Sequence, residues 1–100
     1  MVKELDEINI MGVDYDIQYV DVVNKENPEY GEVNFFNSVI KIDNSLSDDM
    51  KQVTLIHEII HCICLGLGLY EISENEIIVQ SLSTALYDVW KTNFAGANKL

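Results

Sequence analysis

The sequence predicts a small α+β domain, with strands in its N-terminal half and helices in its C-terminal half. In the first half, β-branched and aromatic residues alternate with polar ones between turn signals. After residue 47 the apolar residues recur at intervals of three and four, which is typical of helices packed by one face. The chain has 100 residues, 48% of them apolar, so we expect one domain over residues 1–100 with a single small core.

The first strands are expected to form a hairpin. Residues 8–10 lead to a turn signal at Gly12, and over residues 15–19 tyrosine and isoleucine alternate with aspartate and glutamine. Residues 24–31 collect asparagine, proline and glycine without a period, so they are expected to form a loop.

Two further strands are expected before the helices, at Val33–Phe36 and Val39–Asp43, with a turn at Asn37-Ser38. In the second of these, Ile40 and Ile42 would share one face. The expected sheet therefore spans about residues 8–43.

The period changes at Ser47, which is expected to cap a long amphipathic helix over residues 48–66. A serine hydroxyl there can accept a hydrogen bond from the first turn, and Asp48 and Asp49 favour the positive end of the helix dipole. The apolar positions that predict the helix are Val53, Ile56, Ile60, Ile63 and Leu67. The two glycines of Gly66-Leu-Gly68 predict its end.

A second helix is expected over about residues 74–93. Ser73 and Glu76 have the spacing of a capping box, which predicts its start. The stripe expected to face the first helix consists of Ile78, Leu82, Ala85, Leu86 and Val89. The tail from Phe94 to Leu100 is expected to fray.

The charge balance excludes two classes of partner. Seventeen acidic residues against six basic ones give a net charge of −11, and all six basic residues are lysines. Binding a phosphate backbone or an anionic membrane surface needs clustered positive charge, so we expect neither nucleic acid nor membrane as a partner. The acidic N-terminus has no signal-peptide pattern, and no apolar run approaches the length of a membrane span, which favours the cytoplasm.

The chemistry-bearing motif is His57-Glu58-Ile-Ile-His61, an HExxH pattern within the first expected helix. Histidines four apart lie one helical turn above each other, so both imidazoles can reach one metal ion. Glu58 flanks that face, where a carboxylate can take the proton of an activated water. The three-histidine HExxHxxGxxH pattern is absent, because Cys64 and Leu67 occupy its glycine and last histidine positions. The alternative is that two histidines merely pack on a helix surface.

A third metal ligand has to be a carboxylate or a thiolate, because the chain contains only two histidines. In glutamate-ligand zincins this ligand lies on the helix that follows, which makes Glu71, Glu74 and Glu76 the candidates. Glu76 is favoured because it lies in the first turn of the second helix, beside the stripe expected to face the first. The alternative is that Glu76 is only the last residue of the Ser73 capping box.

The two cysteines are expected to be core residues. Cys64 lies on the metal side of the helix one turn beyond His61, so a ligand role is open, but a small buried cysteine is more often packing. Cys62 points away from His61, and the two thiols diverge on one helix, so a disulfide between them is sterically poor. Tyr30, Tyr70 and Tyr87 could donate to an oxyanion, and their spacing selects none of them.

Several segments carry a family resemblance: Val39–Asp43, Gln52–His61 and Glu76–Leu86, with a weaker likeness at Ile10–Tyr15 and Gly31–Phe35. Over about residues 8–93 the chain resembles small phage and mobile-element HExxH proteins related to ImmA/IrrE-type zinc metallopeptidases. HExxH is the specific part of that likeness. The resemblance implies a minimal zincin-like fold, with a small twisted sheet against the HExxH helix and a second, ligand-bearing helix. It also implies a protein substrate and the cytoplasm of a bacterial host.

The function expected from these observations is a Zn²⁺-dependent peptidase, with His57, His61 and Glu76 as metal ligands and Glu58 as general base. An alternative is a catalytically idle metal-binding module of phage origin whose acidic surface contacts a partner protein. A third is a purely structural phage protein. The substrate and the oligomeric state stay open. If the chain is a peptidase, Val39–Asp43 is expected to form the sheet edge on which a peptide adds as a strand.

Overall fold

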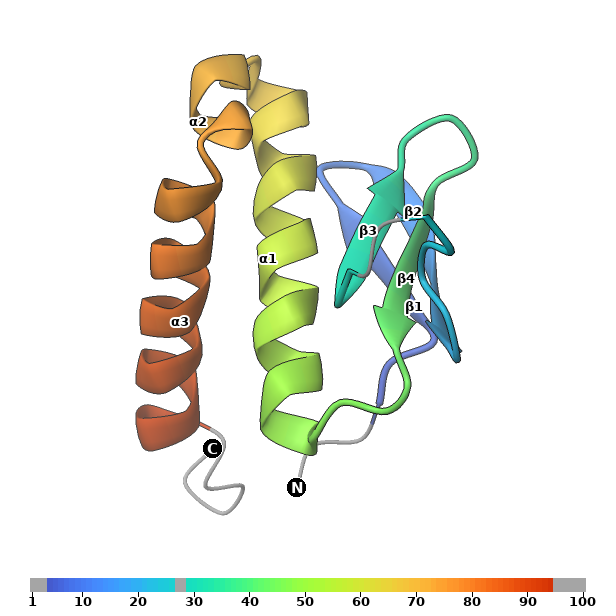
Figure 1. The fold of residues 1–100 in the computed structure, drawn as a ribbon. Coiled ribbons are helices and arrows are strands. Elements are labelled where there is room, and N and C mark those ends of the chain that lie inside the picture. Colours follow the sequence, from blue (N-terminus) through green and yellow to red (C-terminus); the bar gives the residue numbers. More distant parts are fainter. Residues whose placement is uncertain (1–3, 27–28, 95–100) are drawn as a thin grey trace.

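The structure is a computed structural model that describes residues 4–26 and 29–94, and it has the expected α+β architecture (Figure 1). Its elements in chain order are β1 (Glu7–Ile10), β2 (Val13–Val20), β3 (Gly31–Asn34), β4 (Val39–Asp43), α1 (Asp48–Leu67), α2 (Tyr70–Glu74) and α3 (Glu76–Asn93). The sheet lies on one side of α1 and α3 lies on the other, so α1 is the central layer.

The four strands form one mixed sheet in the order β1-β2-β4-β3. The expected hairpin is confirmed, since β1 and β2 pair antiparallel around Met11 and Gly12, which have φ angles of 51° and 87°. Two consecutive residues with positive φ are typical of a tight hairpin turn whose twist matches that of the strands. β2 pairs parallel with β4, and β3 pairs antiparallel with the other side of β4.

The prediction that Val39–Asp43 is the sheet edge is wrong. In β4, Ile40 pairs in register with Ile17 on one side and with Val33 on the other. Ile40 and Ile42 are fully buried, as an inner strand under a helix requires. The alternation of residues identifies the faces of a strand, whereas its neighbours depend on the tertiary fold.

β3 is one of the two edge strands of the sheet. It begins at Gly31 rather than at Val33. A Cβ on Gly31 would lie 2.6 Å from Cγ2 of Thr54 on α1, so only glycine fits where the strand crosses the helix. The turn follows over residues 35–38 and places Ser38 at a φ of 56°. The expected turn residues are therefore confirmed, and the strand before them is displaced by two positions.

α1 has the expected boundaries and joins two apolar clusters. Ser47 Oγ accepts a hydrogen bond from the Met50 N–H at 3.2 Å, and Gly68 ends the helix in the left-handed conformation. Leu55 and Cys62 face the sheet, whereas Ile60 and Cys64 face α3. α1 is long and apolar enough for a membrane span by length and composition, and in this fold it lies between the sheet and α3.

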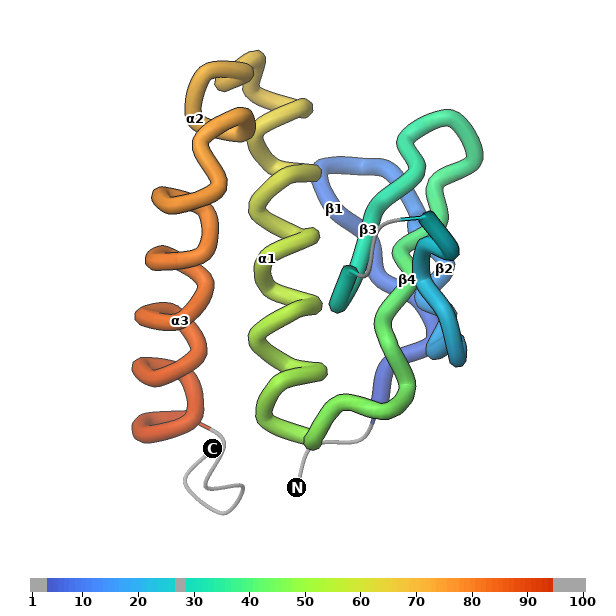
Figure 2. The backbone as a smooth tube through the Cα atoms, in the orientation of Figure 1, coloured from blue at the N-terminus to red at the C-terminus, as the bar shows by residue number. Residues whose placement is uncertain are grey.

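The capping box expected at Ser73 is wrong. The chain turns from α1 through the short helix α2 before α3 begins (Figure 2). Asn75 caps α3, because its side chain accepts a hydrogen bond from the Ile78 N–H at 3.2 Å. Ser73 lies inside α2, and its hydroxyl contacts His61 instead.

The face of α3 that packs on α1 differs from the expected one. Val79 and Ser83 are fully buried, whereas Ile78, Leu82, Leu86 and Val89 are between 41% and 51% exposed. The Ser83 hydroxyl donates to the Val79 carbonyl at 2.6 Å, so this small polar residue is satisfied within its own helix. The expected and the observed faces of α3 both repeat at helical spacing. The smaller side chains of the observed face allow α3 to pack closely on α1. Phe94 caps α3 by donating its N–H to the Trp90 carbonyl, and the rest of the expected tail, 95–100, lies outside the described residues.

Candidate metal centre

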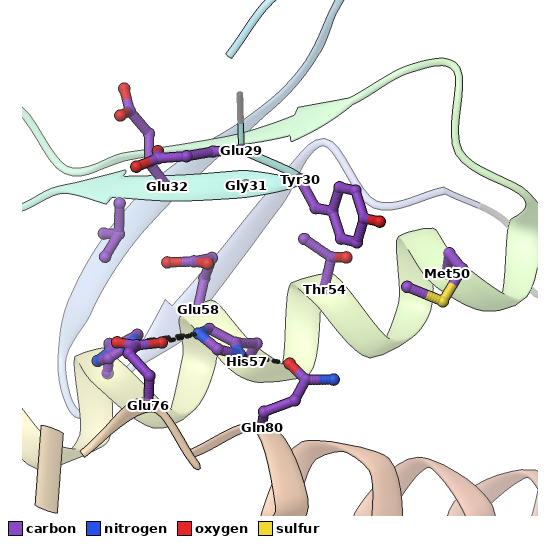
Figure 3. Close-up of a pocket in the computed structure, with 12 residues that line it drawn as sticks. Glu29, Tyr30, Gly31, Glu32, Met50, Thr54, His57, Glu58, Glu76 and Gln80 are labelled. Atoms are coloured by element: carbon purple, nitrogen blue, oxygen red, sulfur yellow. Dashed lines mark hydrogen bonds and ion pairs between the residues drawn. The ribbon is translucent and has the colours of Figure 1, made fainter. Parts of the chain in front are cut away.

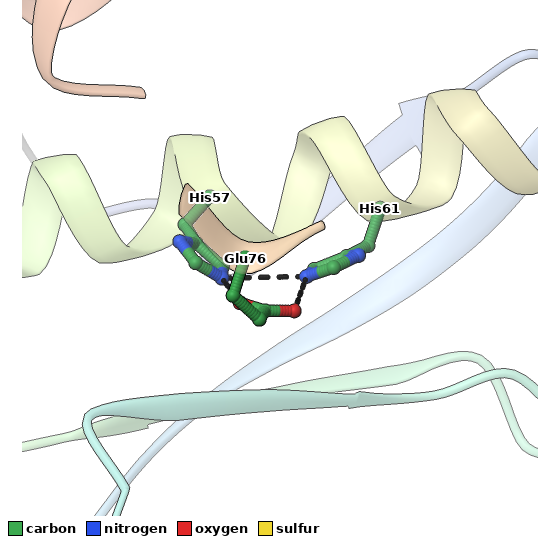
Figure 4. A group of neighbouring side chains, drawn as sticks. All are labelled: His57, His61 and Glu76. Atoms are coloured by element: carbon green, nitrogen blue, oxygen red, sulfur yellow. Dashed lines mark hydrogen bonds and ion pairs between the residues drawn. The ribbon is translucent and has the colours of Figure 1, made fainter. Parts of the chain in front are cut away.

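Three side chains from two helices converge on one point (Figure 4). His57 and His61 lie one turn apart on α1, and their Nε2 atoms are 3.3 Å apart. Glu76, the first residue of α3, places one carboxylate oxygen 2.8 Å from Nε2 of His57 and the other 3.0 Å from Nε2 of His61. The structure thus brings the three expected ligands together and leaves the other two candidates, Glu71 and Glu74, outside the group.

The spacing of these atoms fits a small metal ion. A tetrahedral ion with bonds of about 2.0–2.1 Å holds its ligand atoms about 3.3 Å apart. The measured separations of 2.8–3.3 Å need only a slight outward movement to match this. Two imidazole nitrogens and one carboxylate oxygen are also the donor set of catalytic zinc sites that leave a fourth position open.

The far nitrogen of each imidazole is held by a second residue. His57 Nδ1 lies 2.8 Å from the amide oxygen of Gln80, and His61 Nδ1 lies 2.7 Å from Ser73 Oγ. An amide oxygen only accepts hydrogen bonds, so His57 Nδ1 is the donor in this contact, and Nε2 is the nitrogen that would bind a metal ion at the shared point. Partners of this kind orient the imidazoles of metal sites.

Sequence reasoning missed both of these partners. Gln80 follows Glu76 by one helical turn, so the two share a face of α3, and this spacing was the available signal. The sequence predicts that Ser73 caps the second long helix, whereas in the structure Asn75 caps it. No local pattern indicates that α2 turns the Ser73 hydroxyl towards α1.

Burial favours the ligand form of His61. Removal from water lowers the pKa of its imidazole, an effect that the Glu76 carboxylate opposes and the neighbouring His57 reinforces. The neutral imidazole is the form that binds metal ions.

Glu58 lies beside the three converging side chains without joining them (Figure 3). Its side chain points into the same cleft, although the residue is only 6% exposed, and it makes no hydrogen bond within the described part of the chain. Burial, followed by the charges of Glu76, Glu29 and Glu32, raises the pKa of Glu58 to about 8. A carboxylate in this position, beside the three converging side chains but outside their group, is better placed to accept a proton than to bind a metal ion.

The raised pKa of Glu58 makes a prediction for the metal-free protein. The folded state favours protonated Glu58, so its contribution to stability is complete below pH 4.5 and is lost as the pH rises towards about 8. Glu58→Gln removes this loss. We expect the metal-free variant to exceed wild type in free energy of unfolding by on the order of 3 kcal/mol at pH 7.5. Urea unfolding with a chelator measures this, and a difference that is equal at pH 4.5 and pH 7.5 would contradict it.

A cleft of about 470 Å³ opens over the point where His57, His61 and Glu76 converge. Its walls are α1, the first turns of α3 and residues 29–33, which include the start of the edge strand β3 (Figure 3). Of the three tyrosines considered above, Tyr30 lines it and Tyr70 and Tyr87 do not. The contribution of β3 to this wall was not expected, because the sequence pattern pointed to Val39–Asp43.

Both cysteines are free and buried in the core, as expected. Cys64 packs with Ile60 and Val79 between α1 and α3. Cys62 faces the sheet, where burial raises the pKa of its thiol to about 11 even though Tyr15 provides a hydrogen bond. Neither thiol of α1 joins the group formed by His57, His61 and Glu76.

Comparison with other proteins adds no relative. No protein-family model, curated protein or solved structure matches this chain. The case for the site therefore depends on the geometry of its own residues.

Proposed function

We propose that the protein is a zinc-dependent peptidase with His57, His61 and Glu76 as ligands and Glu58 as general base. The observation that supports this is the convergence of two imidazole nitrogens and a carboxylate within 3.3 Å, with a buried carboxylate beside them in an open cleft. The resemblance to small HExxH metallopeptidases agrees with it and implies a protein or peptide substrate.

The residues of the cleft have separate tasks in this reaction. Zn²⁺, when bound, supplies a Lewis acid for the scissile carbonyl and lowers the pKa of a water molecule to about 7. Glu58 accepts the proton of the attacking water and passes it to the leaving nitrogen. A divalent cation next to Glu58 favours its ionised form, which brings its pKa down from the metal-free value of about 8 into the range of a base.

The backbone of a substrate would be held by β3. This strand pairs with β4 on one side only, and residues of β3 line the cleft on the other. An extended peptide can add to such an edge through main-chain hydrogen bonds, which bring affinity with little sequence preference. The peptide edge expected at Val39–Asp43 is therefore proposed for β3 instead.

A catalytically idle metal-binding module is the second candidate. The exposed stripe of Ile78, Leu82, Leu86 and Val89 on α3 favours it, because contiguous apolar surface often marks a protein interface. Incubation of zinc-loaded protein with a panel of denatured proteins, followed by mass spectrometry of new N-termini, separates the two. New N-termini that disappear with chelator support the peptidase. Zinc binding without new N-termini favours the idle module.

The Glu76 assignment makes a prediction of its own. Glu76→Gln is expected to weaken zinc affinity at least about tenfold, because it removes the negative charge and one donor from the group. Glu74→Gln serves as the matched control, since Glu74 is exposed and lies outside the group. Competition with a zinc-binding dye measures both. Equal, small effects from the two substitutions would remove Glu76 from the ligand set.

A further inference from the structure

α3 carries a stripe of exposed apolar side chains, here called the α3 stripe, which consists of Ile78, Leu82, Leu86 and Val89. At 3.6 residues per turn these positions lie within about 80° of each other around the helix and extend about 17 Å along it. α3 is the outermost layer of the fold, and the described elements that pack on it are α1 and α2 (Figure 1). The stripe therefore lies at the surface with none of the described elements over it.

No charged residue interrupts the α3 stripe, although the chain has a net charge of −11. Eleven successive uncharged residues, 77–87, separate Glu76 from Asp88. The only lysine of α3, Lys91, forms an ion pair with Asp49. A helix that lies on a membrane surface carries lysines and arginines beside its apolar face, so the composition of α3 disfavours a membrane as the occupant. A basic partner would find no carboxylate along the stripe either.

The α3 stripe is complementary to a second copy of itself. When two α3 helices run antiparallel and cross near Thr84, Ile78 of one copy lies beside Val89 of the other, and Leu82 lies beside Leu86. A two-fold axis repeats each of these contacts, so one set of residues forms both halves of the interface. Such an interface needs no second kind of protein.

The charges at the ends of α3 favour the same orientation. In the antiparallel pair, Glu76 of one helix lies at the level of Lys91 of the other, and Asp88 lies at the level of the uncharged Gln80. A parallel pair would instead bring Glu76 to the level of Glu76 and Asp88 to that of Asp88, where like charges repel. The antiparallel pair also sets the positive end of each helix dipole beside the negative end of the other.

The apolar area of the stripe is what a small dimer interface needs. Its four residues are between 41% and 51% exposed, which leaves on the order of 350 Å² of apolar surface per copy, as in the patches that mark interaction sites. About 65% of a homodimer interface is apolar, so two such stripes correspond to about 1,100 Å² of buried surface in total. Specific interfaces begin at about 1,000–1,200 Å².

We infer that the protein forms a two-fold symmetric dimer in which the α3 stripes of two copies pack antiparallel. The residues of α3 that line the cleft, Glu76 and Gln80, lie more than about 100° around the helix from the centre of the stripe. The dimer contact and the cleft therefore use different faces of α3. The dimer does not depend on metal binding or on the cutting of peptides, so it can be tested separately from the proposed function.

The test is sedimentation velocity of the purified protein in the presence of chelator, from about 1 μM to about 1 mM protein. We expect the mass to rise from 11.4 kDa towards twice that value, with a Kd on the order of 10–100 μM, because the interface lies at the lower end of the size range. The contact is uncharged while the two acidic chains repel each other. The dimer is therefore expected to be several-fold tighter in about 0.5 M salt than in about 0.05 M salt.

Two variants place a carboxylate in the contact. Leu82→Glu lies at the centre of the stripe and is expected to weaken the dimer at least about hundredfold, because two unpaired charges would be buried. Ala85→Glu changes an exposed residue at the edge of the stripe, beside Ile78, and is expected to act in the same direction without affecting the packing of α3 on α1. Circular dichroism checks that both variants fold. Ile77→Glu is the matched control, because it adds the same charge at an 80% exposed position on another face of α3, and it should dimerise like wild type.

The opposite results are as clear. A mass of one chain up to about 1 mM wild-type protein would overturn the inference and leave the stripe to a different protein. A dimer that persists in folded Leu82→Glu and Ala85→Glu would place the contact on another surface. A dimer that Ile77→Glu weakens equally, or that loosens as the salt concentration rises, would also contradict an uncharged contact at the α3 stripe.

Discussion

Glu58→Gln is expected to keep the fold and the bound zinc while lowering peptide hydrolysis by about 10²–10⁴-fold. Glu58 is outside the group of converging ligand atoms, so its replacement leaves the three donors in place. Glutamine has nearly the same shape but cannot accept the proton of the attacking water. The measurement is the rate at which new N-termini form in a denatured-protein panel, with zinc content determined on the same samples.

Glu74→Gln is the matched control for this result, because it makes the same chemical change at an exposed position away from the cleft. It should hydrolyse the panel as fast as wild type. If Glu58→Gln also cleaves as fast as wild type while holding zinc, Glu58 is not the base. Loss of zinc from Glu58→Gln would instead make Glu58 part of the ligand set.

Zinc at about 1,000 times its Kd is expected to raise the free energy of unfolding by about 4 kcal/mol, and His57→Ala is expected to remove this gain. The ion would bind the folded chain through donors from both α1 and α3, which unfolding separates. Urea unfolding at pH 7.5, with zinc or with chelator, measures the gain. It should decline below about pH 6.5, because protons then compete for the imidazoles.

If zinc still raises the free energy of unfolding of His57→Ala, the stabilising zinc is bound by other residues. Glu71→Gln provides the comparison, since this exposed carboxylate lies outside the group and its loss should leave the gain unchanged.

Features determined by neighbouring residues were predictable from the sequence. Ser47 and Gly68 mark the ends of α1 because a cap hydroxyl and a left-handed glycine act within a single turn. The hairpin at Gly12 and the common face of His57 and His61 follow from local geometry in the same way.

Features that depend on which elements meet were not predictable. β3 rather than β4 became the edge because strand order is decided by how the sheet packs on α1. The face of α3 was misassigned because Val79 and Ser83 repeat with the same period as the larger residues beside them, and the smaller pair allows closer packing.

The sequence predicts the position of Glu76 correctly, but one of the two observations behind that prediction is wrong. Its position at the start of α3 directs it towards α1, as expected, although the stripe thought to guide it faces away. Gln80 shares its face and holds His57, a contact that becomes visible only once α1 and α3 are packed.

The most direct measurement of the central claim is an anomalous difference map at the zinc absorption edge, from crystals of protein loaded with one equivalent of zinc. The account predicts one peak per chain, about 2.0–2.1 Å from Nε2 of both His57 and His61 and about 2.0–2.2 Å from a carboxylate oxygen of Glu76. Glu58 should stay beyond bonding distance of that peak. Absence of a peak between these three residues, or a peak held by other side chains, would contradict the account.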